Sequence, residues 1–292
     1  PGPRPQSAAP RRATSLDVFA LVTPELDQGF YPALQRGFDA AANEYGRQII
    51  ACQTDNSIHK QADVVIQLAD KGVAGVAMLP PSAGVAPASH VRLLQNQGIP
   101  VVLLHRPVEG VSAPLITLPA ERIGEMAGRQ LLAAGHKRVD YMATQRVTVA
   151  RRYEVGLREA LADGGASLPD DWVDYGEMTG FSKEDYAEYH DHVTGVLDRL
   201  FAQPEPPTAI FTSFETLAEL VYLAATQNGL RVPQDLSIVT VGSSKRGGAI
   251  TQSMTAVTVN EGEAGDRAAR LLEEMNRGER PIDDDEAFTA AI

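Results

Sequence analysis

The sequence predicts an α/β protein built on doubly wound parallel sheets, and three observations lead to that prediction. Short apolar runs alternate with amphipathic helical patterns along almost the whole chain. The runs are continuous instead of alternating in polarity, which indicates strands buried on both faces of a parallel sheet. Several helical segments end in glycine, which accepts the left-handed conformation that stops a helix. At 292 residues, two sheets are favoured over one.

Eight segments have the length and composition of buried strands. Each is a short apolar run in which β-branched residues are common, and such runs fit a pleated surface covered on both sides. In chain order they are Val18–Val22, Gln48–Cys52, Gly75–Leu79, Pro100–Leu104, Arg138–Ala143, Thr208–Ser213, Ser237–Gly242 and Thr255–Val259.

Helices are predicted between these strands. In the first of them, Leu34, Phe38 and Ala41 recur with the period of one helix face. Repeated β-α units then require right-handed crossovers between parallel strands. The other predicted helices are His59–Asp70, Ala88–Asn96, Glu121–Ala134, Arg151–Asp163, Lys183–Phe201, Glu215–Asn228 and Glu261–Arg277.

The composition is that of a globular protein. Hydrophobic residues make up 43% and charged residues 22% of the chain. No apolar run reaches the roughly 18–20 residues that span a bilayer, and the start of the sequence has no apolar segment of a signal peptide. The single cysteine, Cys52, excludes an internal disulfide and fits a cytoplasmic protein with no membrane partner. The formal net charge of −12 argues against broad nucleic-acid binding.

Candidate binding residues follow the predicted strands, because open parallel sheets bind ligands beyond the carboxyl ends of their strands. Aromatic side chains there can stack on a small ligand, and Asp, Asn or Arg can bond its hydroxyl groups. Phe30 and Tyr31 either fill the core or stand over such a pocket. No catalytic set of nucleophile, base and orienting residue is evident, so no enzyme is expected. The residues are Asp27, Gln28, Phe30, Tyr31, Thr54, Asp55, Asn56, Pro80, Pro81, Ser82, His105, Arg106, Thr144, Gln145, Phe214, Glu215, Ser243, Ser244, Lys245 and Arg246.

Three arginines each have two interpretations. Arg106 follows a buried strand, where it either clamps a ligand with both guanidinium nitrogens or pairs with a carboxylate at the sheet edge. Arg151 and Arg152 begin a predicted helix, where cations are unfavourable against the helix dipole. They either face a ligand or are solvated.

No metal or cofactor is expected. His190 and His192 are two residues apart on a predicted helix, so they do not share a face, and no third ligand is evident. The loop GSSKRGG, residues Gly242–Gly248, has the composition of a phosphate-binding nest but not the residue order of a P-loop. A flexible loop is the simpler interpretation.

The order of these segments resembles a known family. The chain resembles the effector-binding core of LacI-family bacterial transcription regulators, which is itself similar to periplasmic sugar-binding proteins, along nearly its full length. The ordered set, more than any single stretch, makes the resemblance specific. The stretches are FALVTPELDQGFYPALQRGFDAAANEYG, LADKGVAGVAML, GIPVVLLHR, AGRQLLAAGHKRVDYM, RVPQDLSIVTVG and MTAVTVNEGEAGDRAARLL.

The resemblance implies two Rossmann-like lobes of the periplasmic binding protein type I-like fold. Residues 1–14 are expected to be the remnant of a hinge or linker. The N-terminal lobe is expected over 15–135 plus 258–280, and the C-terminal lobe over 136–257 plus 281–292. The lobes are expected to close on a small effector, a sugar or sugar derivative, and so to change operator binding. The ligand residues implied are Phe30, Tyr31, Asp55, Arg106, Arg152, Phe181, Glu215 and Ser243, with Phe181 as a stacking wall.

The resemblance also implies a homodimer and a DNA partner. The opening stretch GPRPQSAAPRR resembles the segment that leaves the helix-turn-helix of the family and enters its hinge helix. A DNA-binding headpiece is therefore expected to be missing from this sequence, and operator DNA to be contacted through it. The other interpretation of the basic residues Arg4, Arg11 and Arg12 is a disordered tail.

The chain departs from the family pattern at binding positions. His105 stands where the family usually has an Asp before the residue that corresponds to Arg106. Ser243 and Ser244 stand where many members carry a carboxylate that binds hydroxyl groups. Tyr153 occupies the usual position of the helix arginine, and Arg152 lies one place early. Pro10 interrupts the expected hinge helix. The ligand residues therefore leave the identity of the effector open, a non-sugar included.

Two other functions remain open at this point. A free-standing periplasmic solute-binding protein of a sugar transporter would share the fold, but it needs an export signal and none is visible. An α/β enzyme that acts on sugars or nucleosides would depend on Glu215 or Asp55 for turnover. A helix-turn-helix upstream would favour the regulator, and a cleavable signal the transporter component.

Overall fold

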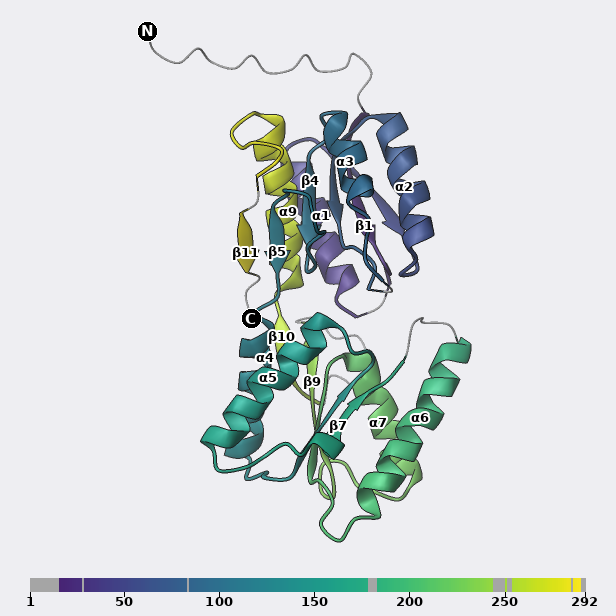
Figure 1. Cartoon of the computed structure of the whole chain (residues 1–292), viewed down its shortest axis with the longest axis vertical. Coiled ribbons are helices and arrows are strands. Elements are labelled where there is room, and N and C mark those ends of the chain that lie inside the picture. The colour runs from purple at the N-terminus through teal and green to yellow at the C-terminus, as the bar shows by residue number, and fades with distance from the viewer. Residues whose placement is uncertain are drawn as a thin grey trace. The chain divides into compact units, whose positions relative to one another are not determined.

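The computed structural model describes residues 16–27, 29–82, 84–177, 183–243, 250, 254–284 and 286–289, and of residues 183–185 the backbone alone. The chain divides into two compact units. The first unit extends to Thr117 and resumes at Glu261, and the second runs from Leu118 to Asn260. Each unit is a parallel sheet with helices on both faces (Figure 1), which confirms the predicted fold class.

The first sheet has the strand order β11-β5-β4-β3-β1-β2, and all neighbouring strands are parallel. Side chains of β1 alternate between two buried faces. Ala20 and Val22 pack in one cluster with Leu68 of α2, and the ring of Phe19 lies 6.2 Å from that of Phe38 in α1. The helices pack in the pairs α1 with α9 and α2 with α3. The bounds are β1 Leu16–Thr23, α1 Tyr31–Glu44, β2 Gln48–Gln53, α2 Ile58–Lys71, β3 Val73–Met78, α3 Ala88–Asn96, β4 Val101–Leu104, β5 Leu115–Thr117, α9 Glu261–Asn276 and β11 Ala287–Thr289.

The second sheet has the strand order β10-β9-β8-β6-β7 and is also parallel throughout. Tyr141 of β6 is fully buried, and its hydroxyl donates a hydrogen bond of 2.8 Å to the carbonyl oxygen of Ala150 in α5. Helix α4 packs on α5, and α6 packs on α7. The bounds are α4 Ala120–Ala133, β6 Val139–Ala143, α5 Thr148–Asp163, a 3-10 turn Asp170–Trp172, β7 Val173–Tyr175, α6 Lys183–Phe201, β8 Ala209–Thr212, α7 Glu215–Gln227, β9 Ser237–Ser243 and β10 Thr255–Val259.

The eight predicted strands are confirmed, but the unit boundaries differ from those expected from the resemblance. Residues 118–135, expected in the N-terminal lobe, lie in the second unit because α4 packs on α5 and contacts β9 and β10. Residues 281–290, expected in the C-terminal lobe, lie in the first unit because β11 pairs with β5. The expected remnant, residues 1–14, is outside the described residues.

Each unit contains one pair of helices in close contact through glycine. A Cβ atom at Gly37 of α1 would lie 1.8 Å from the carbonyl oxygen of Gly262 in α9. In the second unit, a Cβ atom at Gly156 of α5 would lie 1.9 Å from the carbonyl oxygen of Glu121 in α4. These distances leave no room for any side chain, so the two helix pairs pack backbone to backbone.

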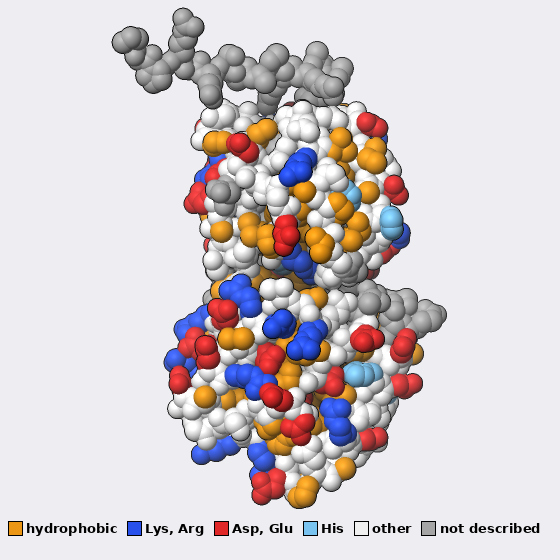
Figure 2. Space-filling model, viewed as in Figure 1, with side chains coloured by type: hydrophobic (Ala, Val, Ile, Leu, Met, Phe, Trp, Pro, Cys, Tyr) orange, Lys and Arg blue, Asp and Glu red, His pale blue; other side chains and the backbone are white. Residues whose placement is uncertain are grey.

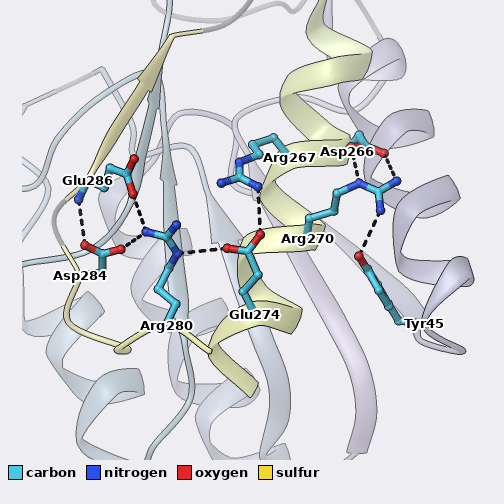
Figure 3. Close-up of polar contacts among 8 residues, drawn as sticks. All are labelled: Tyr45, Asp266, Arg267, Arg270, Glu274, Arg280, Asp284 and Glu286. Atoms are coloured by element: carbon cyan, nitrogen blue, oxygen red, sulfur yellow. Dashed lines mark hydrogen bonds and ion pairs between the residues drawn. The ribbon is translucent and has the colours of Figure 1, made fainter. Parts of the chain in front are cut away.

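Charged residues hold the end of the first unit against α9 (Figure 3). Glu274 of α9 accepts bonds from Arg267 at 2.9 Å and from Arg280 at 3.1 Å, and Arg280 also pairs with Asp284. The guanidinium carbons of the same two arginines lie 4.5 and 5.6 Å from the ring centroid of Phe288 in β11. These contacts anchor the edge strand β11 to α9.

Asp140 is a carboxyl group buried in the second unit without a partner. It lies in β6 with no solvent exposure, and neither of its side-chain oxygens has a hydrogen-bond partner. Burial raises its pKa well above 3.8, nearby Asp174 raises it further, and Arg199 lowers it. Asp174 itself lies 2.8 Å from His192 Nε2. Folding therefore favours the neutral form of the Asp140 carboxyl group.

Replacement of Asp140 by Asn is expected to stabilise the protein at pH 7. Because folding raises the pKa of Asp140, its stabilising contribution is complete below the pKa of the unfolded chain and is lost as pH rises through the folded-state pKa. Asn stays neutral at every pH, so the free energy of unfolding at pH 7 should rise by about 1.4 kcal/mol or more. The gain should shrink towards about pH 4. Thermal unfolding of wild type and variant across this pH range measures the gain, with Asp171→Asn at an exposed position as the control. Equal unfolding midpoints of wild type and Asp140→Asn at pH 7 would refute the prediction.

Gly156→Ala is expected to lower the free energy of unfolding, because its methyl group would clash with the backbone of α4 at Glu121. The expected loss is about 1–3 kcal/mol or more, as for other overpacked interiors. The matched control is Gly195→Ala in α6, where no atom lies within 4 Å of a Cβ, so the higher helix propensity of Ala should leave stability unchanged or raise it by up to about 1 kcal/mol. Chemical denaturation of both variants decides; equal effects would contradict close packing at Gly156.

Candidate functional site

Aromatic side chains meet at the carboxyl ends of β1 and β4 in the first unit. Phe30 precedes α1 and Tyr31 begins it, with their ring centroids 4.3 Å apart. The ring of Phe30 also lies 5.3 Å from that of His105, the residue after β4. Tyr31 is buried, whereas Phe30 is only partly buried. Of the two interpretations of these aromatics, Tyr31 therefore fits a core residue, and Phe30 is the one with an accessible face.

Arg106 lies next to this aromatic group without a carboxylate. Its Nη1 donates to the carbonyl oxygen of Pro80 at the end of β3, and no ion pair of Arg106 occurs in the described residues. Burial lowers its pKa, and the nearby Tyr31 hydroxyl opposes that change. Burial in turn raises the pKa of Tyr31 to about 12. A partly buried cation without an ion pair in the described residues has spare capacity to bind the polar or anionic group of a ligand.

His105 and Glu261 form a buried pair that sequence reasoning missed. His105 Nε2 lies 3.2 Å from Glu261 Oε2, and the two side chains are 7% and 1% exposed. His105 has a φ of +59°, an unusual backbone conformation for a non-glycine residue. Glu261 follows the last predicted strand by two residues, so the rule that places ligands at carboxyl strand ends could have indicated it.

Asp55 already bonds two neighbouring side chains of the first unit. It forms an ion pair with Lys60 in α2 and accepts a bond of 2.6 Å from Gln53 Nε2. The hydrogen bond from Lys60 lowers its pKa. The adjacent Asn56 bonds Ser82 through both its amide nitrogen and its oxygen, which joins the loops after β2 and β3. Asp55 is thus less free to bind a ligand than the sequence suggested.

In the second unit, Glu215 and Ser243 lie at the ends of neighbouring strands. Glu215 begins α7 directly after β8, and Ser243 ends β9; both are largely buried. A Cβ atom at Gly242 would lie 2.4 Å from Glu215 Oε1, so the glycine makes room for this carboxylate. The structure therefore brings these two predicted residues together.

Of the other two predicted residues of this unit, only Arg152 lies within the described residues, and it has a carboxylate partner. Arg152 Nε bonds Glu121 Oε1 of α4 at 3.1 Å, and both side chains are about half exposed, so Arg152 is used between helices. Phe181 is outside the described residues, as are Gln28, Ser244, Lys245 and Arg246. Sequence reasoning overlooked Arg146 and Tyr175, which follow β6 and end β7: the Arg146 guanidinium carbon lies 5.4 Å from the ring centroid of Tyr175.

Neither a metal centre nor a membrane anchor can be recognised within the described residues. No three His, Cys, Asp or Glu side chains there gather in a way that could hold a metal ion. His192 bonds Asp174, whereas His190 lies 3.8 Å from Asp191. None of the helices combines the length and apolar character needed to cross a membrane.

The fold has two parallel α/β units, and aromatic and polar side chains lie at the carboxyl ends of their strands. These two features are typical of two-unit proteins that bind small ligands. Residues 128–288 match the family model described as periplasmic binding protein-like domain. The chain is 25% identical over 275 residues to catabolite control protein A of Priestia megaterium, a match that covers 93% of this chain and 79% of the relative.

Two further comparisons agree with that match. The HTH-type transcriptional repressor PurR of Mannheimia succiniciproducens is 27% identical over 229 residues, which cover 78% of this chain and 65% of the repressor. The fold matches the crystal structure of a LacI family transcriptional regulator from Mycobacterium smegmatis with a TM-score of 0.74 at 21% identity, over 94% of this chain and 97% of that one. The chain belongs to the periplasmic binding protein-like domain family, in the form found in LacI-family transcriptional regulators.

The pair of His105 and Glu261 is expected to show strong energetic coupling. His105→Ala or Glu261→Ala leaves a buried polar partner, and each should lower the free energy of unfolding by about 2–5 kcal/mol. The double variant should lose about 0.5–3 kcal/mol less than the sum of the single losses.

A double-mutant cycle from urea denaturation measures that coupling. The exposed pair of Lys60 and Asp55, whose side chains are 58% and 46% exposed, provides the control cycle and should show at most about 1 kcal/mol. Additive losses at His105 and Glu261 would mean that the two buried groups do not interact.

Proposed function

We propose that this chain is the effector-binding and dimerising part of a LacI-type transcriptional regulator, and that it binds a small effector at the carboxyl ends of its strands. The observation that carries the proposal is the group formed by Phe30, Tyr31 and Arg106 at the carboxyl end of the first sheet. Its aromatic face and its cation without a carboxylate suit a small polar ligand. Glu215 and Ser243 supply hydrogen-bonding groups from the second unit.

The chemistry of these residues favours a sugar or a sugar derivative. A partly buried ring such as Phe30 stacks on the apolar face of a sugar, and the guanidinium of Arg106 donates to its hydroxyl or acidic groups. The second unit adds an acceptor, Glu215, and a hydroxyl, Ser243. Asp55 and Arg152 join the ligand only if they exchange their present partners, Lys60 and Glu121.

The proposed output is a change in DNA binding in the cytoplasm. A homodimer would present two helix-turn-helix headpieces, encoded upstream of this sequence, to operator DNA. The named relatives, one of which is an HTH-type repressor, support this function over solute delivery to a transporter. Effector binding would change operator affinity by a coupling free energy of about 1–3 kcal/mol.

Thermal-shift screening against sugars, polyols, sugar phosphates and nucleosides tests the proposal. A ligand at one hundred times its dissociation constant should raise the free energy of unfolding by about 2.7 kcal/mol. Phe30→Ala and Arg106→Ala are expected to remove most of that gain. Arg36→Ala, at an exposed position of α1, is the control and should retain it. An unchanged gain in both test variants would show that the ligand binds elsewhere.

A further inference from the structure

One carboxylate of β7, Asp174, contacts two basic side chains of helix α6. His192 Nε2 lies 2.8 Å from Asp174 Oδ1, and Arg199 Nη2 lies 3.6 Å from Asp174 Oδ2. Figure 2 shows histidine, acidic and basic side chains at the surface of the second unit. An arginine keeps its charge at every physiological pH, whereas a histidine changes its charge near neutral pH. One of the two contacts that join α6 to β7 is therefore sensitive to pH.

Asp140 lies on the same face of the second sheet as Asp174. The strands β6 and β7 are parallel neighbours in which Met142 pairs with Asp174. Asp140 precedes Met142 by two residues, so the two side chains point to the same face. Tyr141, between them, points to the opposite face, where its hydroxyl group bonds Ala150 of α5. Helices α6 and α7 cover the face of Asp140, and α4 and α5 cover the other (Figure 1).

The elements around Asp140 supply it with no cation of its own. Neither of its carboxyl oxygens has a hydrogen-bond partner in the described residues. Burial raises its pKa, Asp174 raises it further, and Arg199, which already contacts Asp174, lowers it. The neighbouring strand β8 contains no titratable side chain, and α7 contains two glutamates, Glu215 and Glu219, and no basic residue. A negative charge on Asp140 would therefore lie near that of Asp174 and share its cation.

Helix α6 also contacts the carboxyl end of β6, through Tyr189. This side chain is buried, and its hydroxyl group donates a hydrogen bond of 3.0 Å to the carbonyl oxygen of Ala143, the last residue of β6. A Cβ atom at Gly176 would clash with the Tyr189 ring, so the glycine makes room for it. The same ring stacks on His192, with 5.2 Å between the ring centroids. The contact of His192 with Asp174 therefore adjoins the contact of α6 with the strand end.

We propose that Asp140, Asp174 and His192 form a proton-dependent latch, which holds α6 on the second sheet and releases it as pH rises. With Asp140 neutral and His192 charged, the carboxylate of Asp174 has two cationic partners and α6 is docked. Loss of a proton from His192 to solvent removes one cation, and loss of a proton from Asp140 adds a second carboxylate. Release of α6 also breaks the hydrogen bond of Tyr189 at the end of β6, next to the candidate binding residue Thr144. The latch thereby transmits a change of pH to the carboxyl end of the second sheet.

The sign of the pH dependence follows from the burial of Asp140. Burial raises the pKa of Asp140 while α6 is docked, so the docked state keeps a proton that the released state gives up. The contribution of this proton to docking is complete below the pKa of a solvated Asp, about 4, and is lost as pH rises through the pKa of the docked state. The equilibrium constant for release of α6 therefore increases with pH, by at most about tenfold per pH unit for one proton.

Hydrogen–deuterium exchange of the whole chain, measured by mass spectrometry from about pH 5.5 to about pH 8.5, tests the latch. Protection factors, corrected for the intrinsic exchange rate at each pH, report the opening of each helix. Peptides from α6 should lose protection at least about tenfold over this range. Peptides from α5, on the other face of the sheet, should change by less than about twofold and serve as the internal reference. An equal loss in both helices, or no loss in α6, would overturn the latch.

Two variants and a matched control assign the effect to these residues. Asp140→Asn should leave α6 better protected than in wild type at the upper end of the pH range, because Asn cannot become charged. His192→Gln should lower the protection of α6 at the lower end, where the histidine is charged, and have little effect at the upper end. His190→Gln is the control on the same helix, since His190 lies 3.8 Å from the exposed Asp191, and it should match wild type throughout. Protection in Asp140→Asn equal to that of wild type at high pH, or equal effects of the two histidine variants, would contradict the proposal.

Discussion

Burial of both faces of each parallel sheet is the constraint on which the rest of the structure depends. It favours apolar residues along the inner strands, as in β4, where all four residues are apolar and buried. Helices must then cover both faces, and the close glycine contacts at Gly37 and Gly156 let two of these helices share one face. Polar side chains that could serve a ligand are left to the loops where the strands end. The location of the candidate site therefore follows from the way in which the core is built.

In the first unit, the candidate binding residues lie close to the residue at which the chain re-enters this unit. Glu261 is both the first residue of α9 and the first residue of the returning segment. Its contact with His105 links that point to the loop after β4, and Phe30 packs on the His105 ring. A ligand that moves Phe30 or Arg106 would act on a buried pair with few alternative partners.

The sequence was sufficient to predict the strands and helices that depend on local pattern. The continuous apolar runs placed eight strands, and helical periodicity placed α2, α3 and α6 nearly to the residue. Three strands were missed, β5, β7 and β11, because each has only three residues and depends on a neighbouring strand. At the site, strand ends indicated Phe30, Arg106, Glu215 and Ser243. The partners Lys60 and Glu121, which hold Asp55 and Arg152, come from other helices, and no local pattern reveals such tertiary contacts.

The charges at the two sheet edges differ in a way that bears on selectivity. In the first unit Arg106 is partly buried, and its one side-chain hydrogen bond in the described residues goes to the carbonyl oxygen of Pro80. In the second unit Arg146 and Arg151 are exposed, so water already solvates them and a hydroxyl would replace one neutral donor or acceptor by another. A polar group that binds would therefore displace less water from Arg106 than from Arg146 or Arg151.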